Sequence, residues 1–80
     1  MSNEILENLQ IAFRNAFEDK TMIIGLEDSA DTINKWDSLS QIDLISEIEK
    51  EFQIKIDFFE MVELDNVTNI IELIKSKISK

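Results

Sequence analysis

Hydrophobic residues near the start of the chain recur every three or four positions, which is the spacing of one face of an α-helix. This pattern predicts a first helix over about residues 3–18, with Ser2 or Asn3 as its N-cap and with Glu4 and Glu7 near its positive end. The side chains expected to face the core are Ile5, Leu9, Ala12, Phe13, Ala16 and Phe17.

A long connection is predicted next, over about residues 19–37, and it contains Gly25, the only glycine. Residues 28–32 within it are polar and typical of turns. A loop of this length is unusual in so small a domain and is often functional. We expect hydrophobic residues to attach the loop to the core, namely Ile23, Ile24, Leu26, Ile33 and Trp36.

The second predicted helix begins at Asp37 or Ser38 and runs to about Phe52. Acidic residues occupy much of its polar surface, so the helix is expected to be amphipathic, with one face in the core. Its expected apolar stripe consists of Leu39, Ile42, Ile45, Ile48 and Phe52.

The pattern changes after the second helix. Polar and apolar residues alternate over residues 53–57, which favours a short extended segment, and residues 58–63 favour a helix of one or two turns. Two phenylalanines on so short a helix cannot both point the same way. Of Phe58 and Phe59, we therefore expect one in the core and the other partly exposed.

A last helix is predicted to follow Asp65, which is a favourable N-cap. Lysines at its C-terminal end suit the macrodipole, which favours cations there: Lys75, Lys77 and Lys80. The inward-facing residues of this helix are expected to be Val67, Ile70, Ile71, Ile74 and Ile78.

These elements predict an all-α fold: a small antiparallel bundle of four helices, three long and one short, with a long loop between the first and the second. We expect residues 1–80 to form one domain. A chain of 80 residues buries only about 60–65% of its unfolded surface, and this chain has no cysteine that could add a disulfide. Its hydrophobic content of 44% is still enough for one core.

The charge of the chain excludes one class of partner. Its formal net charge is −9, whereas nucleic-acid binding requires a basic surface. No apolar run approaches the roughly 20 residues of a membrane span, and the N-terminus does not resemble a signal peptide. The absence of cysteine fits an intracellular compartment. We expect a cytoplasmic monomer.

Acidic residues are concentrated in one part of the chain. Residues 37–65 hold nine of them against Lys50 and Lys55, which gives −7 of the total −9. A run of charge is usually a solvated surface. The concentration here favours a docking surface for basic patches of partner proteins, because complementary charges steer association.

The most distinctive motif is Asp37-Ser38-Leu39, at the start of the second predicted helix. The simplest interpretation is that Ser38 caps the helix. A helix N-terminus also stabilises an anion, so a phosphate ester on Ser38 would be favourably placed. Without histidine, cysteine, a glycine-rich phosphate loop or a cluster of metal ligands, an enzyme is the least supported class. We expect no catalytic residue and no metal site.

The segment that begins at Trp36-Asp37-Ser38-Leu39 resembles the acyl carrier protein family. The family pattern is Asp-Ser-Leu, an acidic helix ending in Leu/Ile-Glu-x-x-Phe, an x-Ile segment and a short helix before the last one. Here the acidic helix ends in Ile48-Glu49-Lys50-Glu51-Phe52, and Ile54-Lys55-Ile56-Asp57 follows. The resemblance extends from about Asp37 to Ile78.

The resemblance implies a specific function. It implies that Ser38, with Asp37 beside it, receives a 4′-phosphopantetheine arm from coenzyme A through a magnesium-dependent phosphopantetheinyl transferase. The arm would carry acyl groups as thioesters to acyl-activating, acyltransferase or synthase enzymes. The residues expected to bind these partners are Leu39, Ile42, Asp43, Glu47, Glu49 and Glu51.

The chain departs from the common pattern around this motif. Trp36 precedes it, Lys50 and Lys55 replace acidic positions, and Phe58 and Phe59 replace polar ones. We therefore expect a stand-alone carrier of a specialised pathway. The alternatives are an aminoacyl or peptidyl carrier and an acidic helical interaction module in which Ser38 is only a cap. Trp36 either anchors the loop on the core or contacts the arm or a partner.

Overall fold

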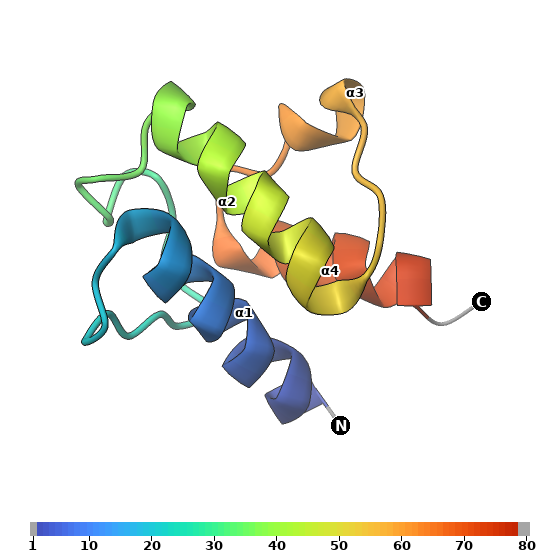
Figure 1. Ribbon diagram of the computed structural model, residues 1–80, viewed down its shortest axis with the longest axis horizontal. Coiled ribbons are helices and arrows are strands. Elements are labelled where there is room, and N and C mark those ends of the chain that lie inside the picture. The colour runs from blue at the N-terminus through green and yellow to red at the C-terminus, as the bar shows by residue number, and fades with distance from the viewer. Residues whose placement is uncertain (1, 79–80) are drawn as a thin grey trace.

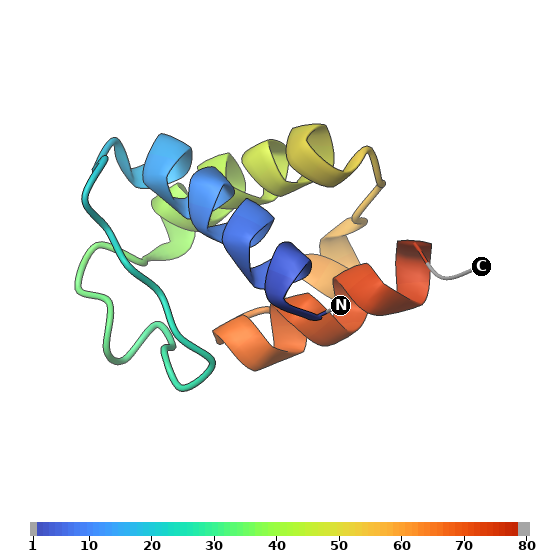
Figure 2. The ribbon, with the colours of Figure 1, turned by 90° about the horizontal axis from the view of Figure 1, so that it is seen from below.

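The computed structural model describes residues 2–78, with side chains from residue 4 onward, and Figure 1 shows its helical bundle. Three long helices, α1 (Ser2–Phe17), α2 (Ser38–Phe52) and α4 (Val67–Ile78), pack together with the short α3 (Phe58–Met61). Helix α1 runs against both α2 and α4, and the long loop lies at one end of the bundle (Figures 1 and 2). The all-α fold predicted from the sequence is confirmed. The predicted cap at Ser2 or Asn3 concerns side chains outside those described.

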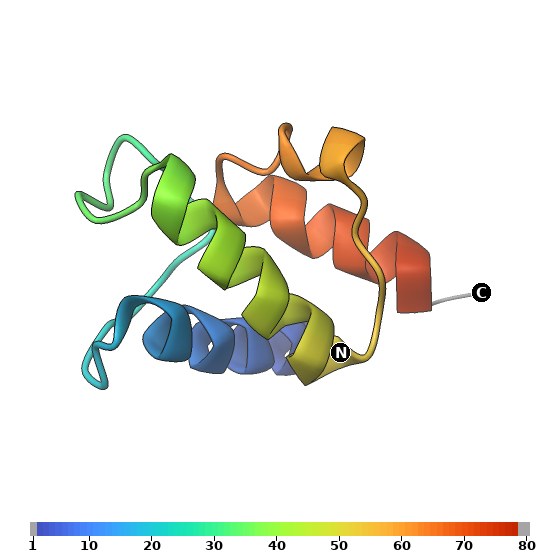
Figure 3. The ribbon, with the colours of Figure 1, turned by 45° about the horizontal axis from the view of Figure 1, so that its top comes forward.

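The core lies between the three long helices, whose arrangement is seen in Figure 3. Phe13 of α1 is fully buried and meets the rings of Phe17 and Trp36 edge-on, with centroids 5.7 and 5.2 Å apart. Each large apolar side chain buried in this way contributes about 1.5–3 kcal/mol to folding. The other largest fully buried side chains are Leu9, Leu44, Ile48, Val67, Ile70 and Ile74.

The phase of α2 differs from the predicted stripe. Its buried residues are Leu44, Ile45 and Ile48, whereas the side chains of Leu39 and Ile42 are 76% and 57% exposed. A step of three residues turns a helix by about 300°, so a stripe counted in threes falls about 60° further behind at each step. The predicted series started on the solvent side and reached the core only in its later members.

The loop between α1 and α2 is attached to the core by fewer hydrophobic residues than predicted. Ile24 and Trp36 are buried and Ile33 is half-buried, but Ile23 and Leu26 are exposed. The backbone N–H of Ile24 donates to the side-chain oxygen of Gln10 at 2.9 Å, so α1 holds the loop at this point. Neighbouring side chains of an extended segment point to opposite sides, which places Ile23 outward when Ile24 is buried.

The same loop is also joined to the start of α4 by backbone hydrogen bonds. The N–H of Val67 donates to the carbonyl of Asp28 at 3.0 Å, and the N–H of Ala30 donates to the carbonyl of Asp65 at 2.9 Å. Between these two bonds, Ser29 and Asn66 form an isolated antiparallel bridge. The loop is therefore a fixed part of the bundle.

Two details of α4 differ from the predictions. The N-cap is Asn66 and not Asp65, because the Asn66 side-chain oxygen accepts the N–H of Asn69 at 2.7 Å. Ile78, predicted to face inward, is 48% exposed because it lies in the last turn, beyond the core. Lys77 in that turn pairs with Glu60 of α3 at 3.0 Å, and Lys80 lies outside the described residues.

The segment between α2 and α4 contains no strand within the described residues. Gln53 ends α2 in the left-handed conformation, after which Ile56 is buried and Ile54 half-buried. Helix α3 has the position predicted from the sequence, but both its phenylalanines are exposed: Phe58 is 67% exposed and Phe59 81%. The prediction that one of them is in the core is wrong. The single turn of α3 directs Met61 inward instead, where it packs against the core.

Candidate functional site

The start of α2 is fixed by Asp37. Its Oδ1 atom accepts the backbone N–H of Ser40 at 2.9 Å and that of Leu39 at 3.1 Å. In return, Ser40 Oγ accepts the N–H of Asp37 at 2.8 Å, which completes a capping box. The hydrogen bond from the Ser40 backbone, with others from the same turn, lowers the pKa of Asp37. Asp37 is therefore an anion at neutral pH.

Because Asp37 is the cap, Ser38 is not, and the interpretation of Ser38 as the helix cap is wrong. Ser38 is the first residue of α2 and its side chain is exposed. Its hydroxyl makes no hydrogen bond to any residue in the described part of the chain. The hydroxyl is thus available for modification, at the helix end where a negatively charged product is favoured.

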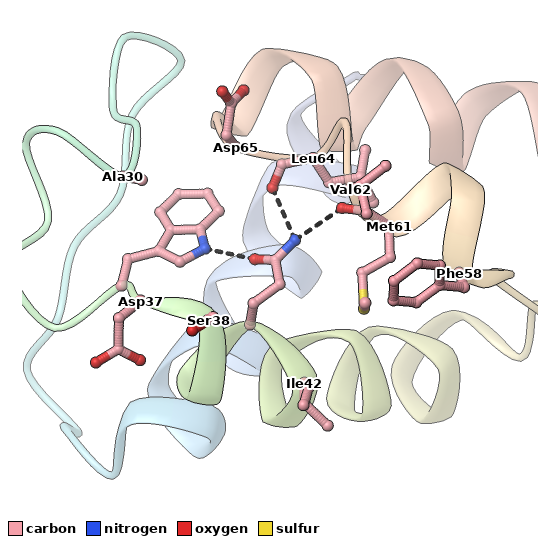
Figure 4. Close-up of a pocket in the computed structure, with 11 residues that line it drawn as sticks. Ala30, Asp37, Ser38, Ile42, Phe58, Met61, Val62, Leu64 and Asp65 are labelled. Atoms are coloured by element: carbon pink, nitrogen blue, oxygen red, sulfur yellow. Dashed lines mark hydrogen bonds between the residues drawn. The ribbon is translucent and has the colours of Figure 1, made fainter.

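Ser38 lies at the edge of a groove between the start of α2 and α3, shown in Figure 4. We call this the Ser38 groove, and its volume is about 490 Å³. Ser38 and Ile42 contribute from α2, and Met61 and Val62 line it across from them. The remaining lining residues are Ala30, Trp36, Asp37, Gln41, Phe58, Leu64 and Asp65.

Trp36 has a role in both the core and the groove. Trp36 is 6% exposed and its ring packs on Phe13, which confirms that it anchors the loop. The same side chain lines the Ser38 groove. Trp36 therefore anchors the loop and also forms part of the groove beside Ser38.

Gln41 is a residue of the site that the sequence analysis missed. Its Nε2 atom donates to the carbonyls of Met61 and Leu64, each at 3.0 Å, and its Oε1 atom accepts the indole N–H of Trp36. The dashed lines in Figure 4 mark these three bonds. The only feature of the sequence that could have indicated this role is the position of Gln41: it is polar but stands four residues before Ile45, on the side of α2 that faces the core.

The predicted partner-binding residues are not equally accessible. Asp43 and Glu51 are exposed, and so are the apolar Leu39 and Ile42. Glu51 lies 13 residues from Ser38, or about 20 Å along the helix axis.

The other two predicted residues have partners inside the chain. The carboxylate of Glu49 accepts the N–H of Ile56 at 2.8 Å, which holds the segment after α2. Glu47 pairs with Lys50 at 3.4 Å. Of the four predicted acidic residues, the two with no such partner in the described chain are Asp43 and Glu51.

Comparisons with known proteins agree with this geometry. The family model for the phosphopantetheine attachment site matches residues 36–74. The NMR structure of holo acyl carrier protein from Geobacter metallireducens superposes with a TM-score of 0.81 and is 35% identical, covering 92% of this chain and 85% of that one. A comparison with curated proteins finds no match.

The chain belongs to the acyl carrier protein family. It is a carrier and not an enzyme, and its cofactor is covalently attached 4′-phosphopantetheine. The site described above suits that cofactor because it offers a free hydroxyl at a helix N-terminus beside a groove.

This carrier shows neither a metal-binding cluster nor a membrane helix in residues 2–78. No three acidic side chains among them are arranged to hold a metal ion. None of their helices combines the length and the hydrophobicity required to cross a bilayer.

Proposed function

We propose that Ser38 carries the 4′-phosphopantetheine arm and that the protein presents acyl thioesters on it to the enzymes of a specialised biosynthetic pathway. The observation that supports this most strongly is the position of the Ser38 hydroxyl. It is exposed, makes no hydrogen bond within the described chain, and lies at the N-terminus of α2 on the edge of the Ser38 groove.

The only group of the carrier that reacts in the attachment is this hydroxyl. Ser38 Oγ attacks the phosphorus of coenzyme A that bears the pantetheine. A new O–P bond forms, the pyrophosphate bond breaks, and adenosine 3′,5′-bisphosphate leaves with the bonding electrons. The hydroxyl proton passes to a base of the transferase. The product is a phosphodiester anion, which the N-terminus of α2 stabilises.

Asp37 contributes in two ways to this proposal. Its Oδ1 atom fixes the first turn of α2, so the Ser38 backbone has one defined conformation. Its Oδ2 atom has no hydrogen-bond partner within the described chain and is available to a metal ion or a basic residue of the transferase. The attached arm supplies the thiol that this cysteine-free chain lacks, and that thiol holds acyl groups as thioesters.

The groove favours an acyl cargo over an aminoacyl one. Most of its lining residues are apolar, among them Ile42, Met61, Val62 and Leu64. An ammonium group against such a surface would lose hydration without gaining hydrogen bonds, whereas an alkyl chain gains from leaving water.

The experiment that tests this function is intact-mass analysis after incubation with coenzyme A, magnesium and a broad-specificity transferase. The protein should gain one phosphopantetheine, and Ser38→Ala should gain none while keeping its helical circular dichroism. Ser46→Ala is the matched control, because Ser46 is an exposed serine of the same helix. Folded wild-type protein that gains no mass would contradict the proposal.

We propose that partners dock on the exposed face of α2 that starts at Ser38. The candidate residues are Leu39, Ile42, Asp43, Glu47, Glu49 and Glu51, with Asp43 the acid nearest to Ser38 that has no internal partner. Exposed charges steer association and are screened by salt. Asp43→Lys should slow modification by the transferase several-fold at low salt. Glu72→Lys, at an exposed position of α4, is the control, and equal effects would exclude a defined docking face.

A specialised pathway is supported by two lysines near this face. Lys50 pairs with Glu47, so it neutralises part of the acidic surface, and Lys55 is exposed. These lysines would repel the basic patch of a partner enzyme that normally binds an acidic carrier surface. Changing both lysines to Glu should improve acceptance by fatty-acid synthesis enzymes and leave Ser38 modification almost unchanged. If the wild-type protein already serves fatty-acid elongation efficiently, the specialised assignment is wrong.

A further inference from the structure

Helix α3 forms one wall of the Ser38 groove but contributes little to the core. None of its four residues is buried, and Phe58 and Phe59 lie mostly in solvent. Its capping box joins Asp57 to Glu60 within the helix itself. Side-chain hydrogen bonds and ion pairs from other helices must therefore help to hold α3 in place.

Three such contacts join α3 and its C-terminal turn to the long helices, and one of them is the bond that Asn69 of α4 donates to the carbonyl of Glu63, at 3.3 Å. Another is the ion pair between Glu60 and Lys77 of α4, at 3.0 Å. The third is the Gln41 amide, the only one of the three that donates two bonds, each 3.0 Å long, to the carbonyls of Met61 and Leu64. Gln41 is half-buried, so its bonds are less exposed to competition from water than those of a surface residue.

The direction of the Gln41 amide is fixed by Trp36. The indole N–H can donate only to the oxygen of the amide, so the NH₂ group must point the other way, toward α3. Trp36 itself is held by its packing on Phe13. These contacts form a continuous connection from the core through the loop and α2 to the wall of the groove that α3 forms.

We propose that Gln41 is the positioning residue that holds α3 against α2 and thereby keeps the Ser38 groove formed. The role of Gln41 in holding α3 does not depend on the proposed function. Its consequence for an acyl cargo does rest on that function. Without the two amide donors, α3 separates from α2 and the wall made by Met61 and Val62 moves away from Ser38. An acyl chain near that wall then becomes more accessible to water.

The first test is amide hydrogen exchange on the unmodified protein. Gln41→Met keeps the length of the side chain but removes every donor, and Gln41→Glu keeps the acceptor for Trp36 and removes both donors. Each should speed exchange at residues 61–64 by about tenfold or more. Exchange at Ala30 and Val67, whose amides join the loop to α4, should remain as in the wild type.

Two further variants locate the effect. Trp36→Phe keeps the ring on Phe13 and leaves the Gln41 donors in place, so it should speed exchange at residues 61–64 less than Gln41→Met does. Ser46→Ala should change nothing. The proposal is overturned if both Gln41 variants exchange as the wild type does, if they speed exchange equally across the whole chain, or if Trp36→Phe equals Gln41→Met.

The second test uses protein loaded by a broad-specificity transferase from octanoyl-coenzyme A. Mass spectrometry then follows loss of the octanoyl group at mildly alkaline pH. Gln41→Met should lose it several-fold faster than the wild type, with the arm itself attached to the same extent. Equal rates of loss would refute the role of Gln41 in cargo protection. If no variant accepts the arm, the proposed function fails, and the exchange experiment still decides whether Gln41 positions α3.

Discussion

The two segments that flank α2 differ in how they are held. The loop before it, residues 18–37, is long, yet it buries Ile24 and Trp36 and joins α4 through backbone hydrogen bonds. The segment after it is shorter and buries Ile56 and Leu64 on either side of α3, but α3 itself has no buried residue. Side chains of the long helices, those of Gln41, Lys77 and Asn69, join α3 and the turn after it to the bundle. The long loop is therefore held by buried side chains and backbone hydrogen bonds, whereas α3 is held mainly by side-chain contacts.

This difference bears directly on the site. Ser38 is the first residue after the fixed loop, and the opposite wall of its groove comes from the lightly held α3. One side of the groove can thus define the position of the hydroxyl. The other depends on the side-chain contacts of α3, which is the role proposed for Gln41.

The largest effect is expected from removing the anchor of the fixed loop. Trp36→Ala should lower the free energy of unfolding by about 3–5 kcal/mol, because it removes a buried aromatic side chain and leaves a cavity against Phe13. Phe59→Ala in α3 should change it by no more than about 0.5 kcal/mol. Chemical denaturation measures both. Similar losses in the two variants would contradict the distinction between the segments.

A smaller effect is expected at the junction, from Asp37. Its pKa is lowered in the folded protein, chiefly by the Ser40 N–H, so its contribution to stability is present at neutral pH. That contribution is lost as the pH falls through the lowered pKa. Asp37→Ala should lower the melting temperature by roughly a few degrees at pH 7, with the difference from wild type narrowing in acid. A difference that widens in acid would exclude this role.

The smallest effect is expected from the ion pair that holds α3. Glu60→Gln should cost at most about 1 kcal/mol, since both side chains of the pair are partly exposed. The amide introduced by this substitution keeps an oxygen that can accept the Asp57 N–H, so the cap of α3 survives. Lys77→Met is the matched variant. The two should have similar effects that disappear at high salt, and a cost that persists in salt would mean that packing, and not charge, holds α3 there.

The helices could be predicted from the sequence because they depend on local patterns, and the assignment of Ser38 rests on a local pattern too. The repeat of Leu9, Phe13 and Phe17 is strong enough to place α1, and Asp37-Ser38-Leu39 is recognisable wherever it occurs. The face of α2 was harder to predict, because Leu39 and Ile42 are apolar but serve the surface beside Ser38 and not the core.

Other features depend on contacts between distant residues and leave little trace in the sequence. The bonds that join Asp28 and Ala30 to the start of α4 use backbone atoms, which every residue has. Gln41 bonds to carbonyls 20 and 23 residues away, so no local pattern marks it. The exposure of Phe58 and Phe59 follows from α3 having only one turn, which directs Met61 and not a phenylalanine toward the core.

The central claim, an arm on Ser38 at the edge of a groove with one fixed wall and one held by side-chain contacts, is tested most directly by NMR. The backbone amide spectra of the protein before and after phosphopantetheine attachment are compared residue by residue. The account predicts that the amides around Ser38 shift, that those of Met61, Val62 and Leu64 shift with them, and that Val67 in the loop–α4 junction does not. Shifts that leave α3 unchanged, or that centre on any residue other than Ser38, would contradict it.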